Sequence, residues 1–154
     1  MDNQMKFENK YENFDLNDEQ CSAVNHIVNK RDNLLPYIVY GPAGTGKTKT
    51  LVAAIAHIVK TTNDNVLVCA QTNSSCDEIT LRLTNYLKKD EMLRLYAKTY
   101  PVQNVNEKLR NFSNICEVNS YFYFDFPRLS CIYNYRVVIC TLCTSSCLAI
   151  KDKS

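Results

Sequence analysis

All three glycines of the chain fall within one eight-residue stretch that ends in lysine and threonine. The stretch is Gly41-Pro42-Ala43-Gly44-Thr45-Gly46-Lys47-Thr48, and it fits the pattern G-x-x-x-x-G-K-[ST]. Glycines let the backbone turn tightly around an anion, so that successive N–H groups face it. The lysine adds a positive charge for the β- and γ-phosphates, and the threonine hydroxyl suits Mg²⁺. This stretch therefore predicts a binding loop for a nucleoside triphosphate with Mg²⁺.

The residues on either side of this loop predict the strand and the helix that such a loop requires. Residues 36–40, Pro-Tyr-Ile-Val-Tyr, form a short apolar run that is typical of a buried strand. Residues 48–60 form a helical pattern with one apolar face, made of Leu51, Val52, Ile55, Ile58 and Val59. A glycine turn without a ligand is the alternative, and the order of strand, loop and helix favours the phosphate site.

Length and composition indicate one domain with an ordinary soluble core. The chain has 154 residues, of which 45% are apolar and 22% charged, and its net charge is +2. That charge neither argues for nucleic acid nor against it. The first 13 residues are too polar for a signal peptide, and several of the eight cysteines lie inside apolar runs. We therefore expect a cytoplasmic protein with reduced thiols, including buried ones at Cys69 and Cys140.

Predicted strands and helices alternate along the chain. The expected helices are residues 16–30, 48–60 and 74–88 with a last turn after 145, and the expected strands are 36–40, 66–70, 92–96 and 136–141. This alternation predicts an α/β fold, a parallel sheet with crossover helices. We expect a flexible lead-in at residues 1–15 and a partial domain at 16–154.

An irregular insertion interrupts this order at residues 101–135. It contains a short helical pattern at 105–112 and the aromatic run Tyr-Phe-Tyr-Phe-Asp-Phe at 121–126. Pro127 and the lack of interleaved basic residues favour an edge element that packs on the core over a platform that stacks bases.

Three polar clusters lie where a parallel sheet of this kind binds ligands. Asn17 and Gln20 have the spacing of a helix-capping pair, and the Gln20 amide also has the donor and acceptor needed to recognise an adenine edge. Thr72 and Asn73 follow the strand at 66–70, and Thr141 ends the strand at 136–141. Both loops can cap a helix or bind a nucleic-acid phosphate. Their occurrence together favours a shared binding surface.

Cys140, Cys143 and Cys147 could form part of a zinc site. A fourth ligand, such as Cys131, would be needed, and tetrahedral sites usually pair two knuckles separated by a dozen residues or more. Cys140 ends a strand-like run whereas Cys147 lies in a helical pattern, so their side chains are expected to diverge. Core or loop thiols are the favoured interpretation.

These motifs together resemble the superfamily 1B RNA helicases, and most closely the Armitage-like group of animal small-RNA pathways. The resemblance rests on Leu-Asn-x-x-Gln at 16–20, the loop at 41–48, Val-Leu-Val-Cys-Ala-x-Thr-Asn-Ser at 66–74, Leu-Arg-Leu-Tyr-Ala-Lys at 93–98 and Tyr-Arg-Val-Val-Ile-Cys-Thr at 135–141. It implies the P-loop part of a first RecA-like domain and an ATP-dependent RNA helicase. Gln71 departs from the family, which usually carries proline there.

The resemblance also implies a ligand set. ATP with Mg²⁺ would bind at 41–48, with Lys47 and Thr48 as the catalytic pair and Gln20 at the adenine. Single-stranded RNA backbone would contact Thr72, Asn73 and Thr141, and small-RNA pathway proteins are possible partners. The family's Asp-Glu pair is expected beyond Ser154, so this chain is expected to lack full hydrolytic activity. Asp125 is the one alternative carboxylate that ends an apolar run.

Two further function classes are open at this point. The chain could be a non-catalytic module from a truncated helicase that binds nucleotide, RNA or protein. It could also be a small P-loop kinase, but a kinase needs an arginine-rich lid near the phosphates. The arginines here are scattered, at positions 82, 94, 110, 128 and 136 among others.

Overall fold

The computed structural model describes the backbone of residues 14–29 and 35–151. It describes side chains in the same ranges up to residue 148. All but the last two residues of the predicted lead-in at 1–15 lie outside this part of the chain. The chain divides into two compact units, residues 1–62 and 63–154, and each unit is described here by itself. No described helix combines the length and the apolarity that a membrane crossing requires.

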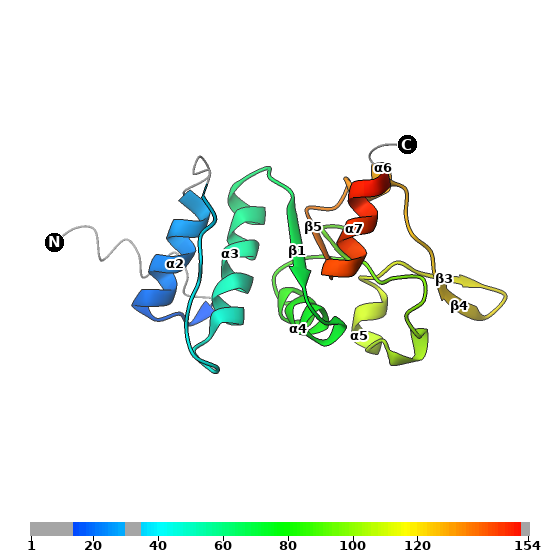
Figure 1. Cartoon of the computed structure of the whole chain (residues 1–154), viewed down its shortest axis with the longest axis horizontal. Coiled ribbons are helices and arrows are strands. Elements are labelled where there is room, and N and C mark those ends of the chain that lie inside the picture. Colours follow the sequence, from blue (N-terminus) through cyan, green and yellow to red (C-terminus); the bar gives the residue numbers. More distant parts are fainter. Residues whose placement is uncertain (1–13, 30–34, 152–154) are drawn as a thin grey trace. The chain divides into compact units, whose positions relative to one another are not determined.

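The first unit is built on two helices, α2 (Asp18–Asn29) and α3 (Lys47–Thr61) (Figure 1). They pack against each other through small and β-branched side chains. The buried apolar residues are Val24 and Val28 of α2 with Val52, Ala53, Ala54, Ile55, Ala56 and Val59 of α3. Both helices were predicted within two residues at each end, because their apolar residues recur at the helical period.

The strand predicted at residues 36–40 is wrong. These residues have no regular secondary structure, and Ile38 and Tyr40 are 79% and 94% exposed. The ring of Tyr37 stacks on that of His26 in α2, with centroids 5.7 Å apart, so the segment runs beside that helix. A short apolar run forms a strand only where neighbouring strands pair with it, and the described parallel sheet is made of other segments.

The second unit contains a three-stranded parallel sheet. Its strands are β1 (Val66–Ala70), β5 (Val137–Thr141) and β2 (Met92–Arg94), in the order β1-β5-β2. The register aligns Ala70 with Thr141 and Arg94 with Ile139. The predicted α/β fold with a parallel sheet is therefore confirmed, and the carboxyl ends of β1 and β5 meet at one edge.

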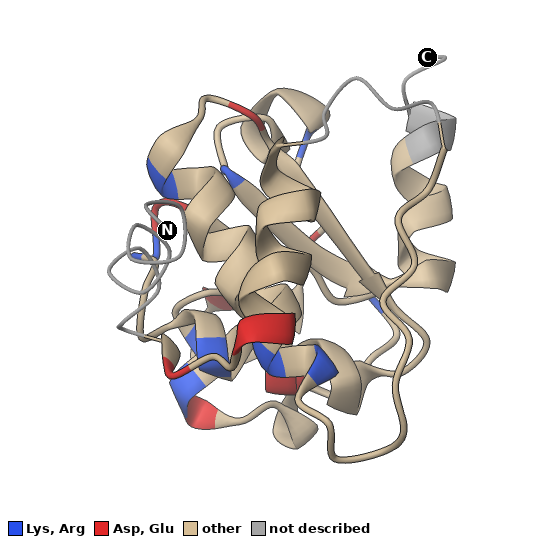
Figure 2. Cartoon of the chain, turned by 90° about the vertical axis from the view of Figure 1, so that its left-hand side faces the viewer, with Lys and Arg blue, Asp and Glu red and all other residues tan. Residues whose placement is uncertain are grey.

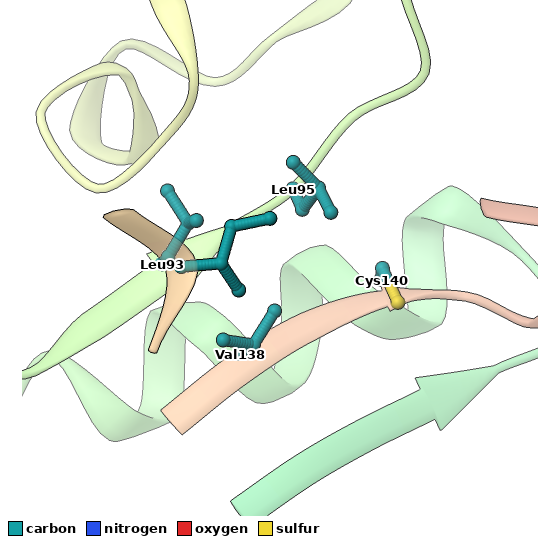
Figure 3. Close-up of a cluster of buried hydrophobic side chains, with 5 residues drawn as sticks. Leu93, Leu95, Val138 and Cys140 are labelled. Atoms are coloured by element: carbon teal, nitrogen blue, oxygen red, sulfur yellow. The ribbon is translucent and has the colours of Figure 1, made fainter. Parts of the chain in front are cut away.

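Helices cover both faces of this sheet. Leu93, Leu95, Val138 and Cys140 form a core on one face, where their side chains gather beside β5 (Figure 3). Leu129 of α6 (Leu129–Ile132) and Leu148 of α7 (Leu142–Lys151) pack against this core. Alternate residues of a strand face opposite sides, and the other face carries Arg94, which bonds to α4 (Asn73–Leu83).

Strand β1 is less buried than its sequence predicts. Leu67 is 54% exposed, and Cys69, expected to be a buried thiol, is also exposed. The reason is topological, since among the described strands of this sheet β1 lies at the end of the order and pairs with β5 on one side. Cys140, on the central strand, is fully buried as predicted.

The insertion predicted at 101–135 contains the short helix expected within 105–112, together with other short elements that single-sequence periodicity does not resolve. They are a 3₁₀ turn (Val102–Asn104), α5 (Glu107–Arg110), the antiparallel pair β3 (Ile115–Val118) and β4 (Tyr121–Phe124), and α6. Asn119 and Ser120 both have positive φ, 50° and 67°, as a tight two-residue hairpin turn of the primed type requires.

The aromatic run at 121–126 packs on the core at Phe124, which is 3% exposed, and at partly buried Phe126. Tyr121, Phe122 and Tyr123 are 45% to 79% exposed, so the prediction of an edge element that packs on the core holds for the second half of the run and not for the first. A two-stranded hairpin presents half of its side chains, or more, to solvent. Buried Asn114 ties the hairpin to the main sheet, because its amide bonds to the Tyr96 backbone at 2.8 and 3.0 Å.

Candidate functional site

The glycine-rich loop has the backbone shape that anion binding needs. Gly44 and Gly46 both adopt the left-handed region, with φ of 82° and 83°. The Thr45 hydroxyl donates to the Pro42 carbonyl at 2.9 Å and closes the turn. Alternation of left-handed and right-handed residues turns successive N–H groups toward one side, which forms a concave site for an anion. A β-carbon at Gly44 would meet no atom within 4 Å, so the space beside the loop is open.

Helix α3 begins directly after this loop, with Gly46 as its N-cap residue and no side-chain cap on its first N–H groups. These donors and the positive end of the helix dipole are therefore available to a phosphate. The Lys47 ammonium donates to the carbonyls of Gly41 and Pro42, both at 2.6 Å, and lies against the loop. Thr48 follows in the first turn and is half-buried. This donor set could hold a triphosphate, and the Thr48 hydroxyl has the chemistry of a ligand for Mg²⁺.

Gln20 lies beside the loop and caps its own helix. The Gln20 backbone N–H donates to Asn17 Oδ1 at 2.9 Å, and the Asn17 N–H donates back to Gln20 Oε1 at 3.1 Å. This reciprocal pair is the capping box predicted from the spacing. The Gln20 amide Nε2 also donates to the Thr45 carbonyl at 3.1 Å. One amide hydrogen and one lone pair of Oε1 are left for an adenine edge.

The loops after β1 and β5 have the same local structure. Thr72 caps α4, because its Oγ1 accepts from the Ser75 N–H at 3.1 Å. Thr141 likewise accepts from the Thr144 N–H at 3.2 Å. In each loop the two hydroxyl oxygens, Thr72 with Ser75 and Thr141 with Thr144, lie 2.9 Å apart. The capping interpretation is therefore confirmed, and two helix N-termini lie at the same edge of the sheet.

The structure brings together two of the three loops of the predicted shared surface, and the inclusion of the third stays a prediction. The loops of Thr72 and Thr141 are brought together by the pairing of β1 with β5. The loop at 41–48 belongs to the other unit and follows an irregular segment rather than a strand of this sheet. The candidate nucleotide residues are therefore described within the first unit and the candidate RNA-contacting residues within the second.

Asn73 is the first residue of α4, and its Oδ1 accepts from Arg94 Nη2 at 2.8 Å. Sequence reasoning treated Arg94 as one of several scattered arginines and missed this contact. The available signal was an arginine inside the apolar run Met-Leu-Arg-Leu-Tyr, on a strand whose three residues are all buried. A charge at such a position needs a partner, because an unpaired buried guanidinium is strongly destabilising.

The alternative metal-binding strand ending at Asp125 is wrong. β4 belongs to the antiparallel hairpin rather than to the parallel sheet. The Asp125 carboxylate forms an ion pair with Lys98 at 3.0 Å and accepts from the Phe126 N–H. In P-loop proteins a carboxylate that acts on ATP-bound Mg²⁺ follows a strand of a parallel sheet, and Asp125 follows an antiparallel hairpin strand instead.

Comparison with known protein families identifies the family of the chain that carries this loop and helix. The family described as AAA domain matches residues 15–123, which include the capping pair, the glycine-rich loop and α4. The chain belongs to this family. The AAA-domain chain is 34% identical over 134 residues to the putative helicase mov-10-B.2 of Danio rerio, with 85% of the chain covered. It is 34% identical over 132 residues to the putative helicase MOV-10 of Gallus gallus, with 85% covered.

A third relative is the RNA helicase Mov10l1 of Homo sapiens, 40% identical over 85 residues and 53% of the AAA-domain chain, a match that spans 7% of the relative. These relatives confirm the resemblance to the Armitage-like superfamily 1 helicases. The chain spans 13% of the length of the first two relatives. No solved structure matches the chain.

Proposed function

We propose that this chain is the ATP-binding portion of an ATP-dependent RNA helicase. ATP would bind with its phosphates in the loop at 41–48 and its adenine at Gln20. The Thr48 hydroxyl would hold Mg²⁺, which neutralises phosphate charge when bound. Single-stranded RNA would contact Thr72, Asn73 and Thr141 through its backbone. Small-RNA pathway partners and a cytoplasmic location stay predictions.

The observation that carries the nucleotide half is the combination of a left-handed glycine pair with an uncapped helix. Gly44 and Gly46 open the backbone toward one side, and α3 offers N–H donors that no side chain caps. Lys47 places a cation on the same loop. All three features favour one ligand chemistry, a polyphosphate.

The RNA half is supported by the chemistry of the edge formed by β1 and β5. Thr72 and Thr141 bring hydroxyl groups and two helix N-termini to this edge, where phosphate oxygens find neutral donors. Charges along the described chain are mixed in sign, as Figure 2 shows, and Arg82 for example pairs with Glu78 at 2.7 Å. Since the net charge of the chain is only +2, we expect weak binding with a shallow dependence on salt.

Calorimetric titration of the chain with ATP–Mg²⁺ tests the nucleotide half. Lys47→Ala should weaken ATP binding about 10- to 100-fold, the loss of one charge-assisted phosphate contact. Lys49→Ala is the matched control, because Lys49 lies on the same helix but pairs with Asp15. Equal ATP affinity in the wild type and Lys47→Ala would contradict the proposal. So would equal losses in the two variants.

A further inference from the structure

Arg94 is a fully buried cation at the end of β2. Its side chain is 0% exposed, and its guanidinium carbon lies 3.9 Å from the centroid of the Tyr96 ring. Three of its nitrogens donate hydrogen bonds: Nε to Asp77 Oδ1 at 2.8 Å, Nη1 to the Leu95 carbonyl at 2.9 Å and Nη2 to Asn73 Oδ1 at 2.8 Å. A buried guanidinium paired in this way has one defined orientation, because its donors are fixed in a plane.

Asp77 and Tyr96 hold that orientation. The Asp77 Oδ1 accepts from Arg94 Nε and also from the Tyr96 hydroxyl, at 2.7 Å. Burial, and then the hydrogen bond to Asp77, raise the pKa of the Tyr96 phenol far above its usual value, so it stays a donor. Buried Asn114 in turn bonds to the Tyr96 backbone on both its N–H and its carbonyl side.

This network determines which end of the Asn73 amide is free to bind a ligand. A guanidinium has donors and no acceptor, so it can pair with the amide oxygen alone. With Oδ1 held by Arg94, the Nδ2 group is left on the other side, as a donor at the start of α4. Thr72, the preceding residue, caps the same helix end.

We propose that Arg94 is a positioning residue that fixes Asn73 as a hydrogen-bond donor to a phosphate or ribose oxygen of the RNA backbone. The inference rests on the proposed RNA contact of Asn73 and adds the residue that orients it. A freely rotating amide would present its oxygen to the backbone for part of the time, and that oxygen repels phosphate. The Arg94 contact removes this second orientation.

A double-mutant cycle tests whether Arg94 acts through Asn73. The readout is the fluorescence anisotropy of a labelled oligouridine titrated with the full chain. Arg94→Lys and Asn73→Ala should each weaken RNA binding about three- to tenfold, which corresponds to the loss of one hydrogen bond. The double variant should bind no more weakly than Asn73→Ala. A structural role for Arg94 predicts instead that the two losses multiply, and that result would overturn the proposal.

Arg82→Lys is the matched control, since Arg82 makes an exposed pair with Glu78 on α4. It should bind RNA as the wild type does. Should Arg94→Lys fail to fold by circular dichroism, Asn73→Asp replaces it, because aspartate keeps the acceptor for Arg94 and loses the donor. Its melting temperature should be unchanged or higher while RNA binding falls at least as far as in Asn73→Ala. Wild-type RNA affinity in Asn73→Asp would overturn the proposal.

A measurement without RNA separates this inference from the proposed function. In ¹⁵N NMR relaxation, the Asn73 side-chain NH₂ should be as ordered as the α4 backbone in the wild type, and mobile in Arg94→Lys. An ordered amide in a chain that binds no oligouridine would mean that the proposed RNA contact fails although the geometry holds. A mobile amide in the wild type would overturn the positioning role itself, whatever the RNA affinity.

Discussion

The side-chain amide of Gln20 donates to the backbone carbonyl of Thr45, 3.1 Å away, and so joins the start of α2 to the glycine-rich loop. A β-carbon at Gly46 would lie 2.5 Å from the same Gln20 nitrogen. The close approach of Gln20 therefore depends on a glycine at position 46. The helix cap and the glycine-rich loop are parts of one local structure.

Replacing Gln20 by alanine should reduce both stability and base preference. The capping box accounts for about 0.5–2 kcal/mol of the free energy of unfolding. If Gln20 contacts adenine, the ratio of ATP to GTP affinity should also fall, because an unmet polar edge discriminates strongly. Asn17→Ala removes the Asn17 half of the cap and should leave the ratio unchanged. A wild-type ratio in Gln20→Ala, measured by calorimetry with both nucleotides, would remove Gln20 from the base site.

Alanine at Gly46 should be more harmful than alanine at Gly44. Both glycines have φ near 80°, so either substitution should cost about 1–2 kcal/mol in backbone strain. At Gly44 the new β-carbon meets open space, whereas at Gly46 it also displaces the Gln20 amide. Urea unfolding and ATP titration of the two variants check this order. In the double variant Gly46→Ala/Gln20→Ala the backbone strain at position 46 should remain, because removing the Gln20 side chain leaves the positive φ in place. Equal losses of stability in Gly44→Ala and Gly46→Ala would contradict the steric argument.

The two threonine caps should contribute alike to the stability of the second unit. Thr72→Val and Thr141→Val each remove one hydroxyl acceptor, and we expect each to lower the free energy of unfolding by about 0.5–2 kcal/mol. Thr72→Ser and Thr141→Ser keep the acceptor and serve as controls. Denaturant titration followed by circular dichroism measures the effect. Valine variants as stable as the serine variants would show that the two caps contribute nothing to the free energy of unfolding.

Alkaline pH should destabilise the fold through Cys140. Burial, and then the neighbouring Cys69, raise the pKa of the Cys140 thiol from 9.0 to about 12. The unfolded chain releases this proton above pH 9.0 and the folded chain keeps it, so stability is complete below pH 9.0 and falls toward about pH 12. The slope from one such group is at most about 1.4 kcal/mol per pH unit. Urea unfolding under reducing conditions should show a shallower slope for Cys140→Ala, and an unchanged slope for Cys143→Ala, an exposed thiol.

The parts of the fold that could be predicted from sequence are those determined by local pattern. Strand β1 was predicted with its observed bounds, because Val66–Ala70 is a compact apolar run between polar residues. The capping pairs at Asn17 and Thr72 follow from residue type and spacing. The backbone of the glycine-rich loop follows from its glycines, two of which adopt positive φ.

The parts that could not be predicted depend on which segments meet. Residues 36–40 have the composition of a strand, but a strand needs a partner, and Tyr37 stacks on His26 instead. The exposure of Cys69 depends on β1 lying at the end of the sheet order. The contact of Arg94 with Asn73 joins residues of a strand and a helix that are separated along the chain. Periodicity carries no information on such pairs.

The central position of β5 has a consequence for the order of folding during synthesis. β1 and β2 each pair with β5 and not with one another, yet β5 is the last strand of the sheet to leave the ribosome. Until residues 137–141 are available, the first two strands have no partner strand in this sheet, while the β3–β4 hairpin can close at once. Because pairing between distant segments is slow, the second unit should acquire protection from proteolysis in a single late step of synthesis.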